Sequence, residues 1–110
     1  MTTGQLRKAV TERFDYAAGI ASGGCIDIDM LWERRGHFLA IENKRPGESF
    51  GKGQLIALRA LAAQGNWTVW VARGNPPNQI VSAGALDGEQ FTMDVTALRA
   101  QIQRWWDAHK

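Results

Sequence analysis

Apolar residues in the middle of the chain form short runs, and a few charged residues interrupt them. Two such runs, 26–32 and 38–42, flank the loop Arg34-Arg35-Gly36. Short apolar runs joined by a glycine-containing loop predict a β-hairpin. We therefore expect residues 26–44 to form two antiparallel strands around a tight turn.

The rest of the chain alternates between helical and strand periodicity. Apolar residues at helical spacing predict helices at 4–18, 52–64 and 96–109, the last capped by Thr96 with Leu98, Ile102 and Trp105 on its buried side. The run 67–72 is apolar on both faces and predicts a buried strand. Residues 73–78 read as a loop, and 80–86 and 91–95 as two shorter strands around Asp87-Gly88.

These elements predict an α/β fold in the order α-β-β-α-β, followed by the two shorter strands and a final helix. The run 67–72 should lie parallel to the run 38–42, because a helix connects them and can cross over the sheet. We expect a mixed central sheet flanked by helices. At 110 residues the chain has the length of a single domain, 1–110.

Four charged residues interrupt the apolar hairpin. Because strand side chains alternate between faces, Asp27 and Asp29 share one face of the first strand, and Glu42 and Lys44 share one face of the second. With Arg35-Gly36 as a two-residue turn, Asp29 lies opposite Glu42 and Asp27 opposite Lys44. A longer loop would shift this register and bring Asp27 opposite Glu42.

Either register brings carboxylates and one ammonium group together among apolar residues, an arrangement that is costly unless something binds there. Carboxylate oxygens are ligands for Mg²⁺ or Mn²⁺, and a Mg²⁺ ion needs only a few of them because it retains water. A neighbouring lysine offers positive charge to a phosphate or to a water molecule. The pattern thus predicts metal-assisted hydrolysis of a phosphodiester.

The residues Asp27, Glu42-Asn43-Lys44 and Gln54 resemble the D…ExK…Q pattern of the PD-(D/E)XK nuclease superfamily. The lead-in Gly24-Cys25-Ile26-Asp27 is similar to that of small stand-alone members, the VRR-NUC type and the Holliday junction resolvases. Two positions depart from the family pattern: Ile26 replaces a proline, and Asn43 replaces an apolar residue.

The resemblance implies a restriction-endonuclease-like core and assigns a role to each site residue. Asp27, Glu42 and the carbonyl of Asn43 would hold Mg²⁺ or Mn²⁺, with Asp29 and Glu12 as supporting acids. Lys44 and Gln54 would act on the attacking water and the phosphate. The expected phosphate contacts are Arg34, Arg35, Arg45, Lys52 and Arg73. Small members of the family are often homodimers from phages or mobile elements that recognise branched or junction DNA.

The net charge, the cysteine count and the length of the apolar runs are compatible with these expectations and exclude some other classes of protein. The net charge of +2 permits binding to DNA but does not require it. The single cysteine excludes an internal disulfide, and no apolar run is long enough to span a membrane. The segment Gly51-Lys52-Gly53-Gln54 lacks the spacing of a nucleoside triphosphate loop. We expect a cytoplasmic protein, in a bacterial cell or a phage-infected host.

Three functional hypotheses follow from the sequence. The first is a structure-selective DNA endonuclease, with a general DNA or RNA nuclease as its variant. The second is an inactive nuclease-fold module that binds nucleic acid or a protein. The third is an accessory protein whose acidic patch only stabilises the fold.

Overall fold

The structure of the chain is a computed structural model that describes residues 26–76 and 78–110. These residues form five strands and two helices: β1 Met30–Arg34, β2 His37–Lys44, α2 Lys52–Ala62, β3 Trp67–Asn75, β4 Gln79–Ala85, β5 Gln90–Thr92 and α3 Val95–Ala108. The helix expected at 4–18, and Glu12 with it, lie outside the described residues.

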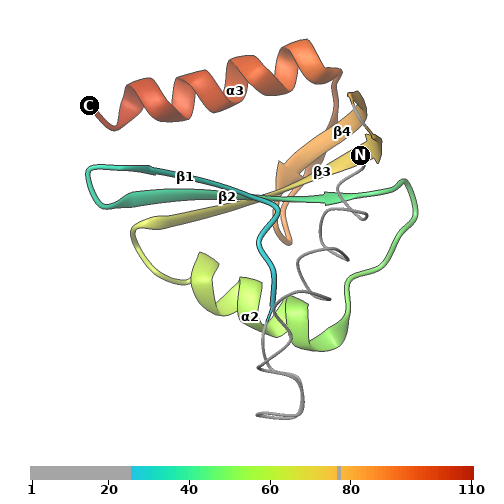
Figure 1. The fold of residues 1–110 in the computed structure, drawn as a ribbon, viewed down its shortest axis with the longest axis horizontal. Helices are drawn as coiled ribbons and strands as arrows, with labels where there is room; N and C mark the ends of the chain where they lie inside the picture. The colour runs from blue at the N-terminus through green and yellow to red at the C-terminus, as the bar shows by residue number, and fades with distance from the viewer. Residues whose placement is uncertain (1–25, 77) are drawn as a thin grey trace, which may run out of the picture.

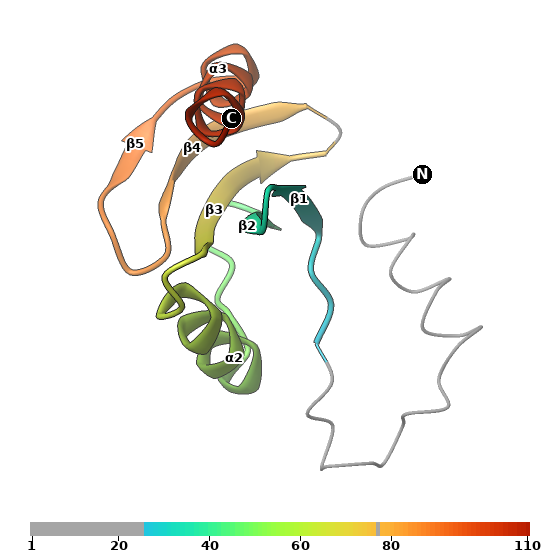
Figure 2. The ribbon, with the colours of Figure 1, turned by 90° about the vertical axis from the view of Figure 1, so that its left-hand side faces the viewer.

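All five strands belong to one mixed sheet in the order β1-β2-β3-β4-β5. β2 and β3 run parallel, and every other neighbouring pair is antiparallel. α2 connects the two parallel strands, as the sequence predicts. Figures 1 and 2 show that α2 and α3 cover opposite faces of the sheet. The predicted α/β class with a mixed sheet flanked by helices is therefore confirmed.

Each helix packs its own apolar core against the sheet. Leu39 and Ile41 of β2 belong to the core under α3, which also contains Leu98 and Trp105. Ala40 belongs to the core under α2, which contains Leu58 and Val69. Since strand side chains alternate between faces, even-numbered residues of β2 point toward α2. Glu42 and Lys44 thus share the α2 face of the sheet.

The β1–β2 hairpin has the shorter of the two registers that the sequence allowed. Arg34 pairs with His37 and Met30 with Ile41, which leaves Arg35 and Gly36 as the turn. Both turn residues have positive φ, 52° and 80°, as in the two-residue turns that match the twist of a hairpin. Glycine adopts this geometry without strain, whereas Arg35 adopts it at a cost.

Three of the expected strand bounds are wrong by three residues or more, and one of them is the end of β5, which is Thr92 rather than 95. β1 begins at Met30 rather than at 26, because the chain leaves the sheet ahead of this residue. β3 continues to Asn75, through residues expected to form a loop. A register shift between Arg73 and Gly74 lets the strand continue past the glycine while pairing with β4.

The final helix begins one residue earlier than its expected cap. Asp94, not Thr96, caps α3, and its carboxylate accepts a hydrogen bond of 2.9 Å from the N–H of Ala97. The expected stripe is confirmed, since Leu98 and Trp105 are buried and Ile102 packs against them. Among the described residues, no helix has the length and apolar character needed to cross a membrane.

Candidate functional site

Glu42 and Lys44 bring opposite charges into the interior on one side of β2. Glu42 has no exposed surface, and Lys44 is 8% exposed. A charge is seldom buried without a partner, because its loss of hydration must be offset by hydrogen bonds or by an opposite charge. The contacts of these two side chains therefore determine what the site can do.

Gln54 joins the two charges in a single chain of hydrogen bonds. Its Nε2 donates to Glu42 Oε2 at 3.1 Å, and its Oε1 accepts from Lys44 Nζ at 3.1 Å. The amide is suited to this position because it offers a donor and an acceptor at adjacent atoms. Gln54 lies in the first turn of α2, so the helix that crosses between β2 and β3 also connects the charged residues. The sequence predicted these three residues as one site, and the structure brings them together.

Asp29, the residue just before β1, lies beside Glu42, in line with the predicted register. Its N–H donates to Glu42 Oε1 at 3.2 Å, and its own Oδ2 accepts the N–H of Asn43 at 2.7 Å. These side-chain bonds replace the backbone ladder at this point and explain why β1 begins only at Met30. Asp29 and Glu42 thus place two carboxylates at the end of the hairpin.

The other predicted ligands are less closely joined to this pair. Asp27 is exposed, and within the described residues it forms no hydrogen bond. Asn43 lies in β2 and pairs with Ala72 of β3, so the strand is not frayed at this position. Its buried Nδ2 has no hydrogen-bond partner among the described residues. An unsatisfied buried donor costs roughly 1–3 kcal/mol.

Two further residues that sequence reasoning missed contact the Lys44 ammonium. Glu48 Oε2 lies 3.9 Å from Lys44 Nζ, and the Phe50 ring centroid lies 4.8 Å from it. Glu48 also accepts the N–H of Arg45 through Oε1 at 2.8 Å, which closes the turn after β2. An aromatic residue in an otherwise polar loop was the only signal in the sequence for the Phe50 contact. Lys44 is thus held by an amide, a carboxylate and an aromatic face.

The five basic residues predicted to contact phosphate divide into two groups. Arg45, Lys52 and Arg73 belong to the end of the sheet where β2 leads into α2. The Arg73 side chain holds the loop after β2 in place, because its Nη1 donates to the carbonyls of Arg45 and Glu48 at 3.1 and 2.6 Å. Arg45 and Lys52 are exposed.

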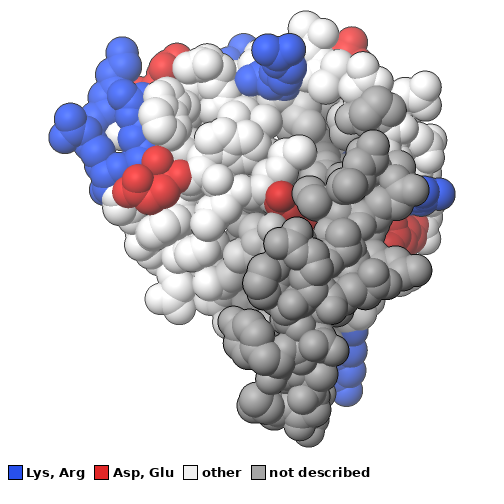
Figure 3. All heavy atoms as spheres, viewed as in Figure 1, with Lys and Arg blue, Asp and Glu red and all other residues white. Residues whose placement is uncertain are grey.

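Arg34 and Arg35 lie at the opposite end of the hairpin. Arg34 is about 17 Å from Glu42 along the strand, at ~3.4 Å per residue. Its Nη1 donates to the carbonyl of Trp106 at 2.7 Å, and its guanidinium lies 4.5 Å from the centroid of that ring. In Figure 3, Lys and Arg atoms gather at this end of the sheet, and fewer lie beside the loop that follows β2. The five predicted phosphate contacts therefore lie in two groups, one at each end of β2.

The donor set suits a hard cation with water in its coordination shell. Asp29 and Glu42 offer carboxylate oxygens, which Mg²⁺ and Mn²⁺ prefer. The described part of the chain contains no group of three or more histidine, cysteine, aspartate or glutamate side chains placed to hold a metal ion. A metal at Asp29 and Glu42 would complete its coordination with water, with oxygens of the substrate or with further protein ligands.

Comparison with known proteins identifies no relative. No family model matches the sequence, and neither the curated proteins nor the solved structures include a match.

Proposed function

We propose that the protein is a metal-dependent nuclease that hydrolyses phosphodiester bonds of DNA. The observation that carries this proposal is the hydrogen-bonded chain from buried Glu42 through Gln54 to Lys44. Buried charges are weak evidence for a stabilising role, since apolar residues in their place are often neutral or stabilising, and this favours a functional role for the chain. The same three residues carry the resemblance to the PD-(D/E)XK nucleases.

In this proposal Asp29 and Glu42 hold the metal ion, and Asp27, Glu12 and the carbonyl of Asn43 are further candidate ligands. A bound Mg²⁺ or Mn²⁺ would lower the pKa of a water molecule and stabilise charge on the phosphoryl oxygens. Asp29 is the stronger candidate of the two hairpin aspartates, because its backbone bonds directly to the Glu42 carboxylate.

Lys44 would supply positive charge to the phosphate as negative charge develops in the transition state. Gln54 would hold the ammonium at one position by accepting its hydrogen bond, and Phe50 would limit its movement on another side. An ammonium with a fixed position gives more stabilisation than a mobile one because it needs no rearrangement during the reaction. Gln54 and Phe50 are positioning residues in this scheme.

The substrate phosphates would follow the N-terminal end of α2. Gly51 precedes this helix without a side-chain cap, and the first turn contains no acidic residue. Free N–H groups at a helix start attract phosphate, and exposed Lys52 adds positive charge at the same place. By resemblance, the substrate would be branched or junction DNA bound by a homodimer.

An inactive module that binds nucleic acid is the second candidate. It is favoured by one observation: the described residues contain no group of three or more histidine, cysteine, aspartate or glutamate side chains placed to hold a metal ion. Such a module would bind DNA through Lys52 and Arg45 in a manner that depends on salt, as phosphate contacts do.

The two candidates can be separated by nicking of a supercoiled plasmid in Mg²⁺ or Mn²⁺. We expect Lys44→Met and Asp29→Asn to reduce nicking by about 100-fold or more, as loss of general acid–base or electrostatic groups does. Glu89→Gln, at an exposed position on the β4–β5 turn, is the matched control and should nick like the wild type. If wild type and Lys44→Met nick equally, the nicking does not depend on the proposed site and the proposal fails.

A further inference from the structure

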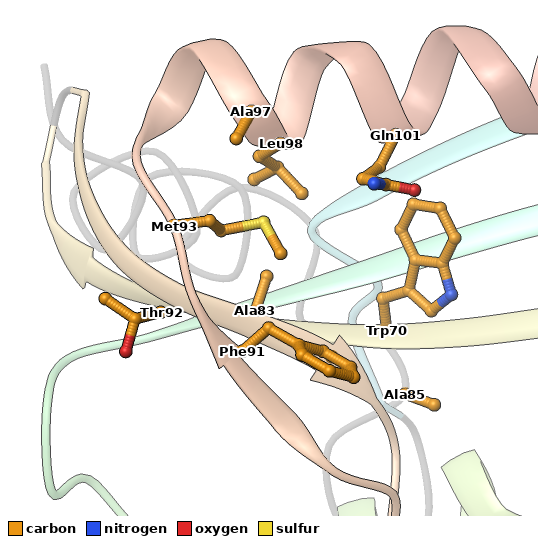
Figure 4. Close-up of a pocket in the computed structure, with 10 residues that line it drawn as sticks. Trp70, Ala83, Ala85, Phe91, Thr92, Met93, Ala97, Leu98 and Gln101 are labelled. Atoms are coloured by element: carbon orange, nitrogen blue, oxygen red, sulfur yellow. The ribbon is translucent and has the colours of Figure 1, made fainter.

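A second concave site lies on the other face of the sheet, between α3 and the β4–β5 hairpin. Its volume is about 540 Å³, within the range of small-molecule sites. Figure 4 shows the side chains that line it. The larger ones are Trp70, Phe91, Met93, Leu98 and Gln101, together with Thr92.

The hollow exists because β4 carries small residues where it passes under α3. Ala83, Gly84 and Ala85 all line the pocket, and their small size leaves space between β4 and α3. A Cβ atom at Gly84 would overlap the backbone oxygen of Glu89, so a larger residue cannot fill the space from this position without moving the hairpin. The pocket is therefore built into the packing of the hairpin.

Two aromatic rings of the lining are available to a ligand. Phe91 is 54% exposed, a high value for a large apolar side chain. Trp70 is partly buried and packs against the core under α3. Among the described residues, neither ring stacks on another aromatic ring. Both rings line the pocket, so a flat apolar group inside it would contact them, and Met93 adds a polarizable thioether, which makes favourable contacts with aromatic rings.

Polar groups accompany the rings. The Gln101 amide offers one donor and one acceptor side by side. The Trp70 indole adds an N–H donor. Within the described residues, the side chains of Gln101 and Trp70 form no hydrogen bond. Figure 4 shows the Gln101 amide beside the Trp70 ring. A ligand that presents a flat face and a polar edge would satisfy both kinds of group.

From this combination we propose that the pocket binds a planar aromatic heterocycle whose edge carries a donor next to an acceptor, the chemistry of a nucleobase. The heterocycle would lie against Phe91 and Trp70 with its edge toward Gln101. It can come from a free nucleoside or from an unpaired base in a single strand.

This site is separate from the proposed nuclease site. Trp70 pairs with Ile41, and both residues belong to the core under α3. Glu42, the next residue of β2, points to the opposite face of the sheet. Binding at the pocket therefore requires neither metal nor Glu42, and a failure of the nuclease proposal would leave this inference intact.

The test is titration of the ¹⁵N-labelled protein with adenosine, a short single-stranded oligo-dA and cyclohexanol, a non-aromatic apolar probe. We expect adenosine or the oligonucleotide to shift the Gln101 side-chain amide and Trp70 indole signals, and cyclohexanol to leave both unchanged. Binding of adenosine would identify a free nucleoside as sufficient, whereas binding of the oligonucleotide alone would identify a base within a strand.

The variants replace exposed or half-buried residues, so the protein should stay folded and differences in binding affinity can be assigned to the pocket. Phe91→Ala should weaken binding about ten-fold or more, since stacking of one base on an aromatic residue contributes ~1–3 kcal/mol. Gln101→Leu should weaken it while leaving the indole shift in place. Val81→Ala, an exposed apolar residue outside the pocket lining, is the control. The proposal is overturned if neither nucleobase probe binds, if cyclohexanol binds as well, or if Phe91→Ala and Val81→Ala bind alike.

Discussion

Replacing Gln54 with leucine tests whether the buried charges depend on the bridge between them. The substitution removes both hydrogen bonds of the amide, to Glu42 Oε2 and to Lys44 Nζ, each 3.1 Å long. Leucine has a similar size and a similar helix propensity, so α2 itself should be unaffected. The predicted change is thus confined to the two bonds.

The magnitude follows from the charge of the partners and from their burial. A hydrogen bond to a charged group contributes about 1.5–3 kcal/mol to stability. Gln54 is only half-buried, so we take the lower value for each bond and expect a loss of about 3 kcal/mol in the free energy of unfolding. For a domain of this size that loss lowers Tm by roughly 12 °C.

The assay is urea and thermal unfolding of wild type, Gln54→Leu and a control. Gln103→Leu is the matched control, because Gln103 is an exposed helical glutamine with one bond to Asp107 of 3.1 Å. Its loss should change stability by less than about 0.5 kcal/mol. If the two variants are equally stable, the bridge contributes nothing and our account of the buried charges is wrong.

Three further changes test the fold away from the site. Asp94→Ala removes the cap of α3 and should cost about 1 kcal/mol, measured by urea unfolding. The hydrogen bond from Arg59 lowers the pKa of Asp87 below its ordinary value of 3.8, so the exposed pair contributes stability above about pH 4 that is lost as pH falls. Asp87→Asn, which tolerates the same positive φ, should therefore melt below wild type at pH 6, and the gap should close toward pH 2; a constant gap would contradict this. Gly74→Ala should unfold at a much lower temperature than wild type, because its Cβ would overlap the backbone of β4, whereas Gly65→Ala, in open space, should not.

The sequence predicted most of the central hairpin because local rules decide it. Arg35-Gly36 allows a two-residue turn, and once that turn is chosen, strand alternation puts Asp29 opposite Glu42. The distance from Lys44 to Gln54 is covered by one turn and the start of a helix. The described residues of the site that are near one another in sequence were therefore accessible to pattern reasoning.

Features that depend on distant contacts were not accessible in the same way. The sequence predicts Arg34 as a phosphate contact but does not predict its bond to the carbonyl of Trp106, 72 residues away. Arg73-Gly74 looked like the end of a strand, but Arg73 bonds to the loop after β2, and the register shift carries β3 onward. In each case a single side chain found a partner that no local pattern indicates.

The pocket under α3 was missed for a related reason. Small residues in a short strand, such as those at 82–85, do not predict which element packs against that face of the strand. Only the placement of α3 over β4 turns them into the floor of a cavity lined by Trp70 and Phe91. A hollow depends on the distance between two elements, and the sequence of either element does not specify that distance.

The most direct test of the central claim is cleavage of a labelled panel by wild type and Glu42→Ala side by side. The panel holds single-stranded, duplex, flap and four-way-junction DNA together with RNA, each in Mg²⁺ or Mn²⁺. Circular dichroism of both proteins would establish that each is folded. We expect wild type to cut at least one DNA member in a metal-dependent manner, with preference for a branched structure, and Glu42→Ala to cut none. If folded wild type cuts nothing with either metal, or if Glu42→Ala cuts as well as wild type, the nuclease account is contradicted.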